Sequence, residues 1–258
     1  MAPNYYKTNA LYEYIEENNL SEYTFAKENL WITIYGDIWS VPKLILVISA
    51  VSDEDYDNSI ISQHERDIIE LCVTFAAKSS LEYRVVRYRK SEWPLQNIQY
   101  MDYPSQCVEV PAHSLVQLFE RNGIRPSAEG TSKDLNDKAA SAFHLWQRTY
   151  LGRNMTVSDI DLIKTDENGH QSIYELKRSF YQLEDWTPFD VDYTNFRLVS
   201  RFADMIGASF QIIYNRRDKD PFRDDISMLK RFSFSPEEGA KYIDTVSLND
   251  FIGGGGNE

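Results

Sequence analysis

Two acidic positions fourteen residues apart carry the strongest chemical signal in this chain. One is Asp161, within an apolar segment, and the other is Glu175, which begins a Glu-Leu-Lys tripeptide ending at Lys177. Carboxylates that converge from neighbouring strands can bind a hard cation such as Mg²⁺, which prefers oxygen ligands. A lysine beside them can orient or deprotonate an attacking water. These residue types indicate metal-assisted cleavage of a phosphodiester bond.

Two strands joined by a tight turn would position these side chains. The pattern of apolar residues predicts strands over 157–164 and 172–178, and the Asn168-Gly169 pair between them favours a hairpin because both residues tolerate positive φ. The alternative is a solvated sheet face with ordinary cross-strand charge pairs. We favour the functional interpretation because both acids lie in apolar strands, where an unpaired charge is costly.

Helices are predicted on both sides of this strand pair. Apolar residues at helical spacing predict a helix over 133–150 before it and another from Tyr193 to Ile206 after it, ended by Gly207. A buried strand is predicted from Ser209 to Tyr214. The order helix, strand, strand, helix, strand predicts an α/β region with a covered sheet.

Over about residues 132 to 215 the sequence resembles the PD-(D/E)XK nuclease superfamily, which is restriction-endonuclease-like. Asp161 and the tripeptide Glu175-Leu176-Lys177 look like its motif, and the predicted elements match its common αβββαβ core with a central mixed sheet. The resemblance implies a metal-dependent endonuclease that hydrolyses DNA. It implies Asp161, Glu175 and Lys177 as catalytic residues. Mg²⁺, or Mn²⁺ in its place, would be bound by Asp161, Glu175 and the backbone carbonyl of Leu176.

The chain departs from the motif at its proline, because Ile160 precedes Asp161 and Ser158 precedes Asp159. Either aspartate can therefore take the motif position, and we favour Asp161. Asp159, two residues earlier on the predicted strand, would share its face and serve as an auxiliary metal ligand or an orienting group.

The charge of the chain bears on its partners. A net charge of -13 argues against indiscriminate coating of DNA, although a local basic groove can still bind it. The candidates for nucleic-acid contacts are Arg178, Arg197, Arg201, Arg216 and Arg217. Trp186, Pro188 and Phe189 either stack on an unpaired base or pack against the sheet. RNA as the substrate, or a non-catalytic module that binds nucleic acid or protein, are the alternatives.

Composition and turn residues set the expected organisation. The 258 residues include 42% hydrophobic ones but no apolar run of about eighteen, so we expect a soluble, intracellular, cytoplasmic protein without a membrane segment. The sequence predicts an N-terminal α/β region over 1–124 that positions substrate or a partner, a nuclease domain over 125–252 and a flexible tail over 253–258. A double-strand cutter commonly needs two active sites, so we expect a homodimer or a protein partner on the acidic surface.

Within the N-terminal region, a strand over 43–51, a helix over 60–77 and a strand over 81–89 predict a crossover unit. The residues from Asp53 to Asp57 predict an acidic loop between the first strand and the helix.

Overall fold

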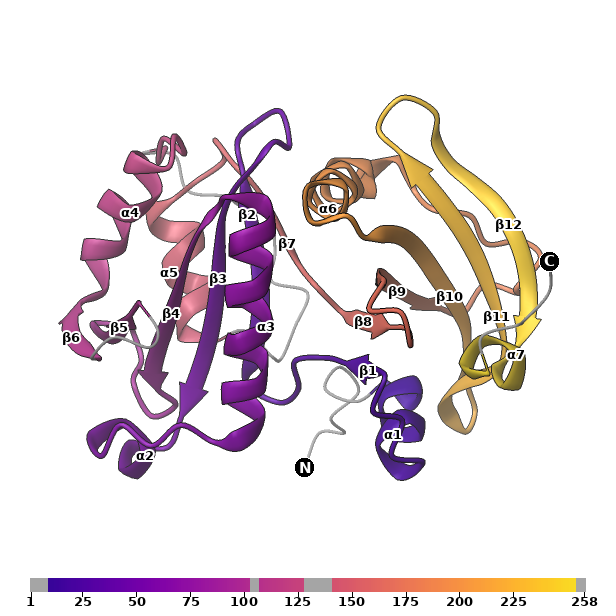
Figure 1. Ribbon diagram of the computed structural model, residues 1–258, viewed down its shortest axis with the longest axis horizontal. Helices are drawn as coiled ribbons and strands as arrows, with labels where there is room; N and C mark the ends of the chain where they lie inside the picture. The colour runs from indigo at the N-terminus through magenta and orange to yellow at the C-terminus, as the bar shows by residue number, and fades with distance from the viewer. Residues whose placement is uncertain (1–8, 103–106, 128–140, 254–258) are drawn as a thin grey trace. The chain divides into compact units, whose positions relative to one another are not determined.

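The computed structural model describes residues 9–102, 107–127 and 141–253, and it is a mixed α/β protein with two six-stranded sheets (Figure 1). Its chain divides into two compact units. Unit 1 comprises Met1–Phe25 and Asp161–Glu258, and unit 2 comprises Ala26–Ile160. These units differ from the predicted division after residue 124, because the N-terminal residues join the C-terminal part of the chain. Within the described ranges, no helix is long and apolar enough to span a membrane.

Unit 2 is built on a sheet with the strand order β6-β5-β4-β3-β2-β7. Its strands are β2 (Leu30–Gly36), β3 (Pro42–Val51), β4 (Glu82–Arg89), β5 (Asn97–Met101), β6 (Val108–Pro111) and β7 (Thr156–Asp159). Its helices are α2 (Asp53–Asp57), α3 (Gln63–Ser79), the 3-10 turn η1 (Ala112–Ser114), α4 (Leu115–Arg121) and α5 (Ala142–Tyr150). β3 and β4 are parallel and α3 connects them, which confirms the crossover unit.

The predicted acidic loop between β3 and α3 is wrong, since residues 53–57 form the helix α2. Ser52 caps this helix by accepting a hydrogen bond from the Asp55 N–H. Acids in the first turn are favourable near the positive end of the helix dipole.

Helices cover both faces of the unit 2 sheet (Figure 1). On one face, Leu46 and Val86 pack with Phe119 of α4 and Phe143 of α5. On the other face, α3 packs against β3 and β4. Sheet, helix pair and single helix therefore form three layers.

Unit 1 is built on a sheet with the strand order β1-β8-β9-β10-β11-β12. Its strands are β1 (Tyr23–Thr24), β8 (Leu162–Thr165), β9 (Gln171–Ser179), β10 (Ser209–Lys219), β11 (Phe222–Ser235) and β12 (Gly239–Ser247). Its helices are α1 (Ala10–Glu17), the 3-10 turn η2 (Asp190–Asp192), α6 (Tyr193–Ile206) and α7 (Leu248–Ile252). As predicted, α6 ends at Gly207 in the left-handed region, with φ of 70°, and leads into β10, which is parallel to β9.

The apolar core on one face of this sheet joins α1 and α7 to the strands. Leu11 and Ile15 of α1 and Phe251 of α7 pack there with Leu162 and Tyr174. Alternate residues on a strand point to opposite faces, so the neighbours of Tyr174 face the other side, where α6 lies. The helix that precedes the strands of unit 1 is therefore α1 rather than the predicted helix over 133–150, whose described part, α5, belongs to unit 2.

The prediction of one continuous strand over 157–164 is wrong. β7 ends at Asp159 and pairs with β2 in unit 2, whereas β8 belongs to the sheet of unit 1. The Ile160 N–H still bonds a carbonyl of β2, but the carbonyl of Asp161 accepts a hydrogen bond from the Tyr12 hydroxyl of unit 1. No Gly or Pro interrupts residues 157–164, although the chain changes sheets there.

The predicted hairpin between the two acids is present as β8 and β9. Gly169 donates to the carbonyl of Asp166 and has φ of 78°, while the Asn168 N–H donates to the Asp166 carboxylate. Only the glycine of the Asn-Gly pair adopts positive φ.

Candidate active site

Asp161 and Glu175 lie opposite each other at the end of the β8–β9 ladder. Leu162 pairs with Tyr174, so Asp161 is one step beyond the last pair and across from Glu175. Directly opposed residues of antiparallel strands share a sheet face, and so do residues two apart on one strand. The geometry therefore brings Asp161, Glu175 and Lys177 together on the face opposite Tyr174.

Lys177 connects this group to α6 and to the turn before it. Its Nζ lies 3.0 Å from Oε1 of Glu175 and 3.8 Å from Oδ2 of Asp192. The same ammonium lies 5.3 Å from the ring centroid of Phe196 in α6. The lysine is thus enclosed by two carboxylates and an aromatic ring.

Burial affects the electrostatic interaction between Glu175 and Lys177. Glu175 is only 8% exposed, on a strand that lies between β8 and β10. Burial by itself would lower the pKa of Lys177, but the charges of Glu175, Asp192 and Asp161 outweigh it and raise the pKa above its ordinary value. The ammonium therefore stays charged, and it offsets the charge of a carboxylate that would otherwise be costly to bury.

Asp161 is held at both its carboxylate and its main chain. Its Oδ2 accepts a hydrogen bond of 2.8 Å from the Leu176 N–H, and its carbonyl accepts one of 2.8 Å from the Tyr12 hydroxyl. Tyr12 is a residue that sequence reasoning missed, because the contact joins positions 149 residues apart. α1 thereby anchors the main chain of Asp161.

The predicted metal ligands offer only oxygen atoms. Among the residues that the structure describes, no group of three or more His, Cys, Asp or Glu side chains is placed to hold a metal ion. Asp161, Glu175 and the carbonyl of Leu176 supply two carboxylates and one main-chain oxygen. Asp159 is not part of this set in unit 1, since it lies on β7 of unit 2 and its Oδ1 accepts a hydrogen bond of 2.6 Å from Thr33.

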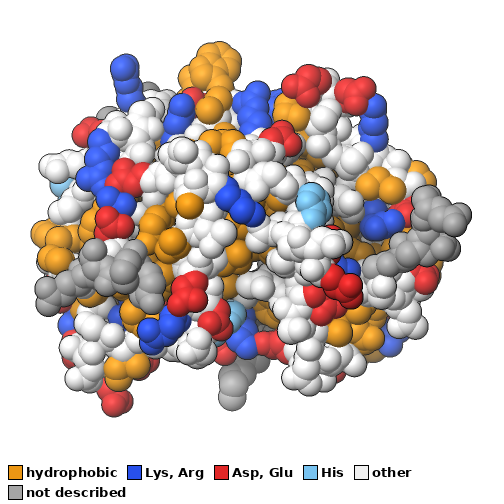
Figure 2. All heavy atoms as spheres, in the orientation of Figure 1, with side chains coloured by type: hydrophobic (Ala, Val, Ile, Leu, Met, Phe, Trp, Pro, Cys, Tyr) orange, Lys and Arg blue, Asp and Glu red, His pale blue; other side chains and the backbone are white. Residues whose placement is uncertain are grey.

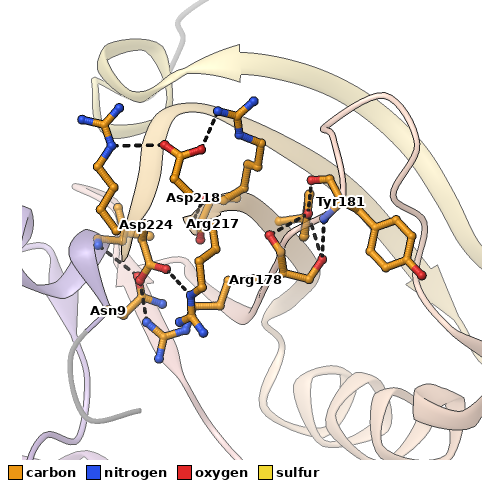
Figure 3. A network of polar contacts seen from close by, with 12 residues as sticks. Asn9, Arg178, Tyr181, Arg217, Asp218 and Asp224 are labelled. Atoms are coloured by element: carbon orange, nitrogen blue, oxygen red, sulfur yellow. Dashed lines mark hydrogen bonds and ion pairs between the residues drawn. The ribbon is translucent and has the colours of Figure 1, made fainter. Parts of the chain in front are cut away.

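Three of the five predicted DNA-contacting arginines form ion pairs within unit 1. Arg178 and Arg217 both bind Asp224, at 2.6 and 2.8 Å, and Arg216 lies 2.6 Å from Asp218 (Figure 3). These carboxylates offset much of the positive charge that a phosphate would meet.

The other two predicted arginines, Arg197 and Arg201, are half-buried on α6. Arg178 follows Lys177 directly on β9, so its side chain leaves the opposite face of the sheet. On the face drawn in Figure 2, Lys and Arg side chains are scattered among Asp and Glu rather than gathered in one patch.

The loop after β9 places one of its aromatics in the core. Trp186 is 3% exposed and stacks on Tyr214, with ring centroids 4.1 Å apart. Packing against the sheet is thus confirmed for Trp186, whereas Phe189 is 46% exposed.

Unit 2 contains a cavity that no predicted site residue lines. Its volume is about 290 Å³, and it lies where β3 ends and α3 begins. Its polar lining is mixed in charge and includes Lys27, Lys90, Glu28 and Asp55. Crevices at the carboxyl ends of parallel strands are common ligand sites in α/β proteins, but the mixed charge does not select one ligand class.

Comparison with known proteins identifies no relative: no family model, curated protein or solved structure matches this chain.

Proposed function

We propose that this protein is a Mg²⁺-dependent nuclease that hydrolyses phosphodiester bonds within DNA. The observation that carries the proposal is the placement of Asp161 opposite Glu175, with Lys177 two residues further on the same strand face. The neighbouring carboxylates raise the pKa of Lys177 above its ordinary value, and ionisable groups with perturbed pKa values cluster at catalytic sites.

The order of elements in unit 1 supports the same proposal. α1, β1, β8, β9, α6 and β10 follow one another as helix, three strands, helix and strand. This is the αβββαβ order of the PD-(D/E)XK superfamily that the motif resembles. Residues 26–160 stand between β1 and β8 in the chain, so the core helix we propose is α1.

The donor set fits the expected metal. Asp161, Glu175 and the Leu176 carbonyl offer only oxygen, which Mg²⁺ and Mn²⁺ prefer. A bound Mg²⁺ would supply a Lewis acid for the scissile phosphate and a more acidic water. We assign no metal contact to Asp159, because the structure places it on the sheet of unit 2.

Lys177 has a role of its own in this proposal. Its ammonium, held 3.0 Å from Glu175, would orient the attacking water and offset the negative charge of the phosphate. Tyr12 would position Asp161 by holding its main chain.

Cleavage of plasmid DNA and of RNA, each with Mg²⁺ and with EDTA, tests the proposal. We expect DNA cleavage only with the metal and a loss of at least about 100-fold in Lys177→Ala. Lys241→Ala, at a 56% exposed lysine of the same unit, is the matched control and should cut normally. A folded wild type that leaves DNA intact with Mg²⁺ or Mn²⁺ contradicts the proposal. Cleavage of RNA alone would mean that the substrate is RNA rather than DNA.

One observation favours a second candidate, a non-catalytic module that binds a protein. The pairing of Arg178, Arg216 and Arg217 with aspartates leaves little basic surface in a chain of net charge -13. A folded wild type without any nuclease activity would support this candidate.

A further inference from the structure

Three large aromatic side chains are exposed in the segment that leaves β9. Phe180 is 46% exposed, Tyr181 55% and Phe189 46%, and Phe180 comes three residues after Lys177. The rings of Tyr181 and Phe189 have centroids 6.2 Å apart, and Phe180 lies 6.3 Å from Phe222, which is itself 41% exposed. We call Phe180, Tyr181, Phe189 and Phe222 the aromatic rim. Single exposed aromatics are ordinary, but two contacting pairs of them around the end of one strand are not.

The segment that carries most of the rim is firmly held. Nζ of the buried Lys230 donates to the carbonyls of Leu183, Glu184 and Trp186, at 2.8, 3.0 and 2.9 Å. Trp186 in turn stacks on Tyr214 with an interplanar angle of 4°. The rim is therefore exposed on a pinned backbone rather than on a loose loop.

Tyr181 shows this arrangement most clearly. Its carbonyl accepts a hydrogen bond of 2.7 Å from the Tyr214 hydroxyl, and its N–H bonds Oγ of Ser179. Figure 3 shows its ring pointing away from these contacts. A surface that is preorganised in this way loses less conformational entropy when it binds a ligand.

Cations lie beside the rim. A hollow of about 190 Å³ is lined by Phe180, Gln182, Arg216, Arg217, Asp218 and Lys219. Nζ of the exposed Lys219 lies 5.0 Å from the ring centroid of Phe180. The acids Glu184, Asp185 and Asp190 are exposed on the same loop, so phosphate attraction there is partly cancelled. The rim offers stacking surface with few unopposed charges.

We propose that the aromatic rim binds unpaired bases, so that the substrate is single-stranded nucleic acid or the single-stranded part of a branched one. This inference rests on the proposed nuclease function, because the rim begins on the chain just after the strand that carries Glu175 and Lys177. Every base has a π face that can stack on an aromatic side chain, whereas the bases of a duplex already stack on one another. Because few rim charges are unopposed, binding depends on stacking and has a shallow salt dependence.

Fluorescence anisotropy of the full chain in EDTA tests the inference without cleavage. The probes are labelled oligothymidylate, oligouridylate and a DNA duplex. We expect a single strand to bind at least about tenfold more tightly than the duplex, and Phe180→Ala, Tyr181→Ala and Phe189→Ala each to weaken it about fivefold or more. Phe180→Trp should keep the affinity, whereas Phe180→Leu should lose it. Tyr242→Ala, at a 58% exposed aromatic on β12, is the matched control.

Equal affinity for single strands and duplex overturns the inference. So does unchanged single-strand binding in the three alanine variants, provided that their melting temperatures match the wild type. Tight single-strand binding without cleavage in Mg²⁺ would instead contradict the nuclease function and leave the binding surface in place. The better of the two single-stranded probes identifies DNA or RNA as the ligand.

Discussion

Lys177 and Glu175 form an ion pair of 3.0 Å on a strand that lies between β8 and β10. The two partners are not equivalent. Lys177 also lies 3.8 Å from Asp192 and interacts electrostatically with Asp161. Removal of the acid leaves the lysine with other carboxylates. Removal of the lysine takes away a positive charge that Glu175, Asp192 and Asp161 share.

This asymmetry predicts unequal effects on stability. Lys177→Met should lower the free energy of unfolding by about 2 to 3 kcal/mol, at or below the low end for a broken buried pair because Lys177 is 27% exposed. Glu175→Gln should cost less than about 1 kcal/mol. Urea denaturation of the two single variants and the double variant measures both. A double variant no more stable than Lys177→Met would contradict this account, since neutralising Glu175 should relieve the acid repulsion.

A second prediction concerns the metal. Asp161→Asn keeps an oxygen that can accept the Leu176 N–H, so its melting temperature should match the wild type while its Mg²⁺ affinity falls at least about tenfold. Calorimetric titration measures the affinity. Asp159→Asn is the matched control, because Asp159 bonds Thr33 in unit 2 and should bind Mg²⁺ normally. If Mg²⁺ affinity falls in Asp159→Asn and not in Asp161→Asn, Asp159 is the ligand instead.

The sequence predicted the part of the site that local patterns encode. Strand alternation and a turn with one positive φ at Gly169 are sufficient for the β8–β9 hairpin, and an apolar stripe ended by Gly207 is sufficient for α6. The change of sheet at Ile160 has no clear local signal, because no Gly or Pro interrupts residues 157–164. The return of α1 and β1 to this sheet depends on pairing between Thr24 and Ile163, which no local pattern contains.

The long strands β11 and β12 have no clear strand pattern in the sequence, because charged residues such as Arg223, Asp224 and Arg231 lie among their apolar residues. In the structure these charges are paired across strands, as Arg217 with Asp224 and Arg231 with Asp244. Cross-strand ion pairs allow polar residues to occupy a sheet, and only the register shows which charges meet.

A third prediction concerns pH and unit 2. Although burial raises the pKa of Glu82, hydrogen bonds from Arg121 and Asn122 and the charge of Arg84 lower it below its ordinary value. The resulting stability is fully present above the unfolded-state pKa of about 4.3 and is lost as pH falls through the lower folded-state pKa. Glu82→Gln should therefore melt about 2 to 4 °C lower than wild type at neutral pH.

The difference in melting temperature between Glu82→Gln and the wild type should shrink as the pH is lowered below about 4. Glu237→Gln, at an exposed position of unit 1, should show no difference at either pH. If the melting temperature of Glu82→Gln stays below that of the wild type in acid, the lost contacts do not depend on the charge of Glu82.

The last prediction separates the anchor of the rim from the rim itself. Lys230→Met should remove the three hydrogen bonds to the carbonyls of residues 183, 184 and 186 while leaving Phe180 and Tyr181 unchanged in sequence. The loss of one buried and two part-buried hydrogen bonds should lower the stability by about 2 to 4 kcal/mol and make the loop a site of proteolysis. Limited proteolysis with mass spectrometry locates the new cuts. Because a loosened loop must be ordered again on binding, the affinity for single strands should also fall. A Lys230→Met variant that binds single strands as tightly as the wild type would show that preorganisation of the rim is not needed.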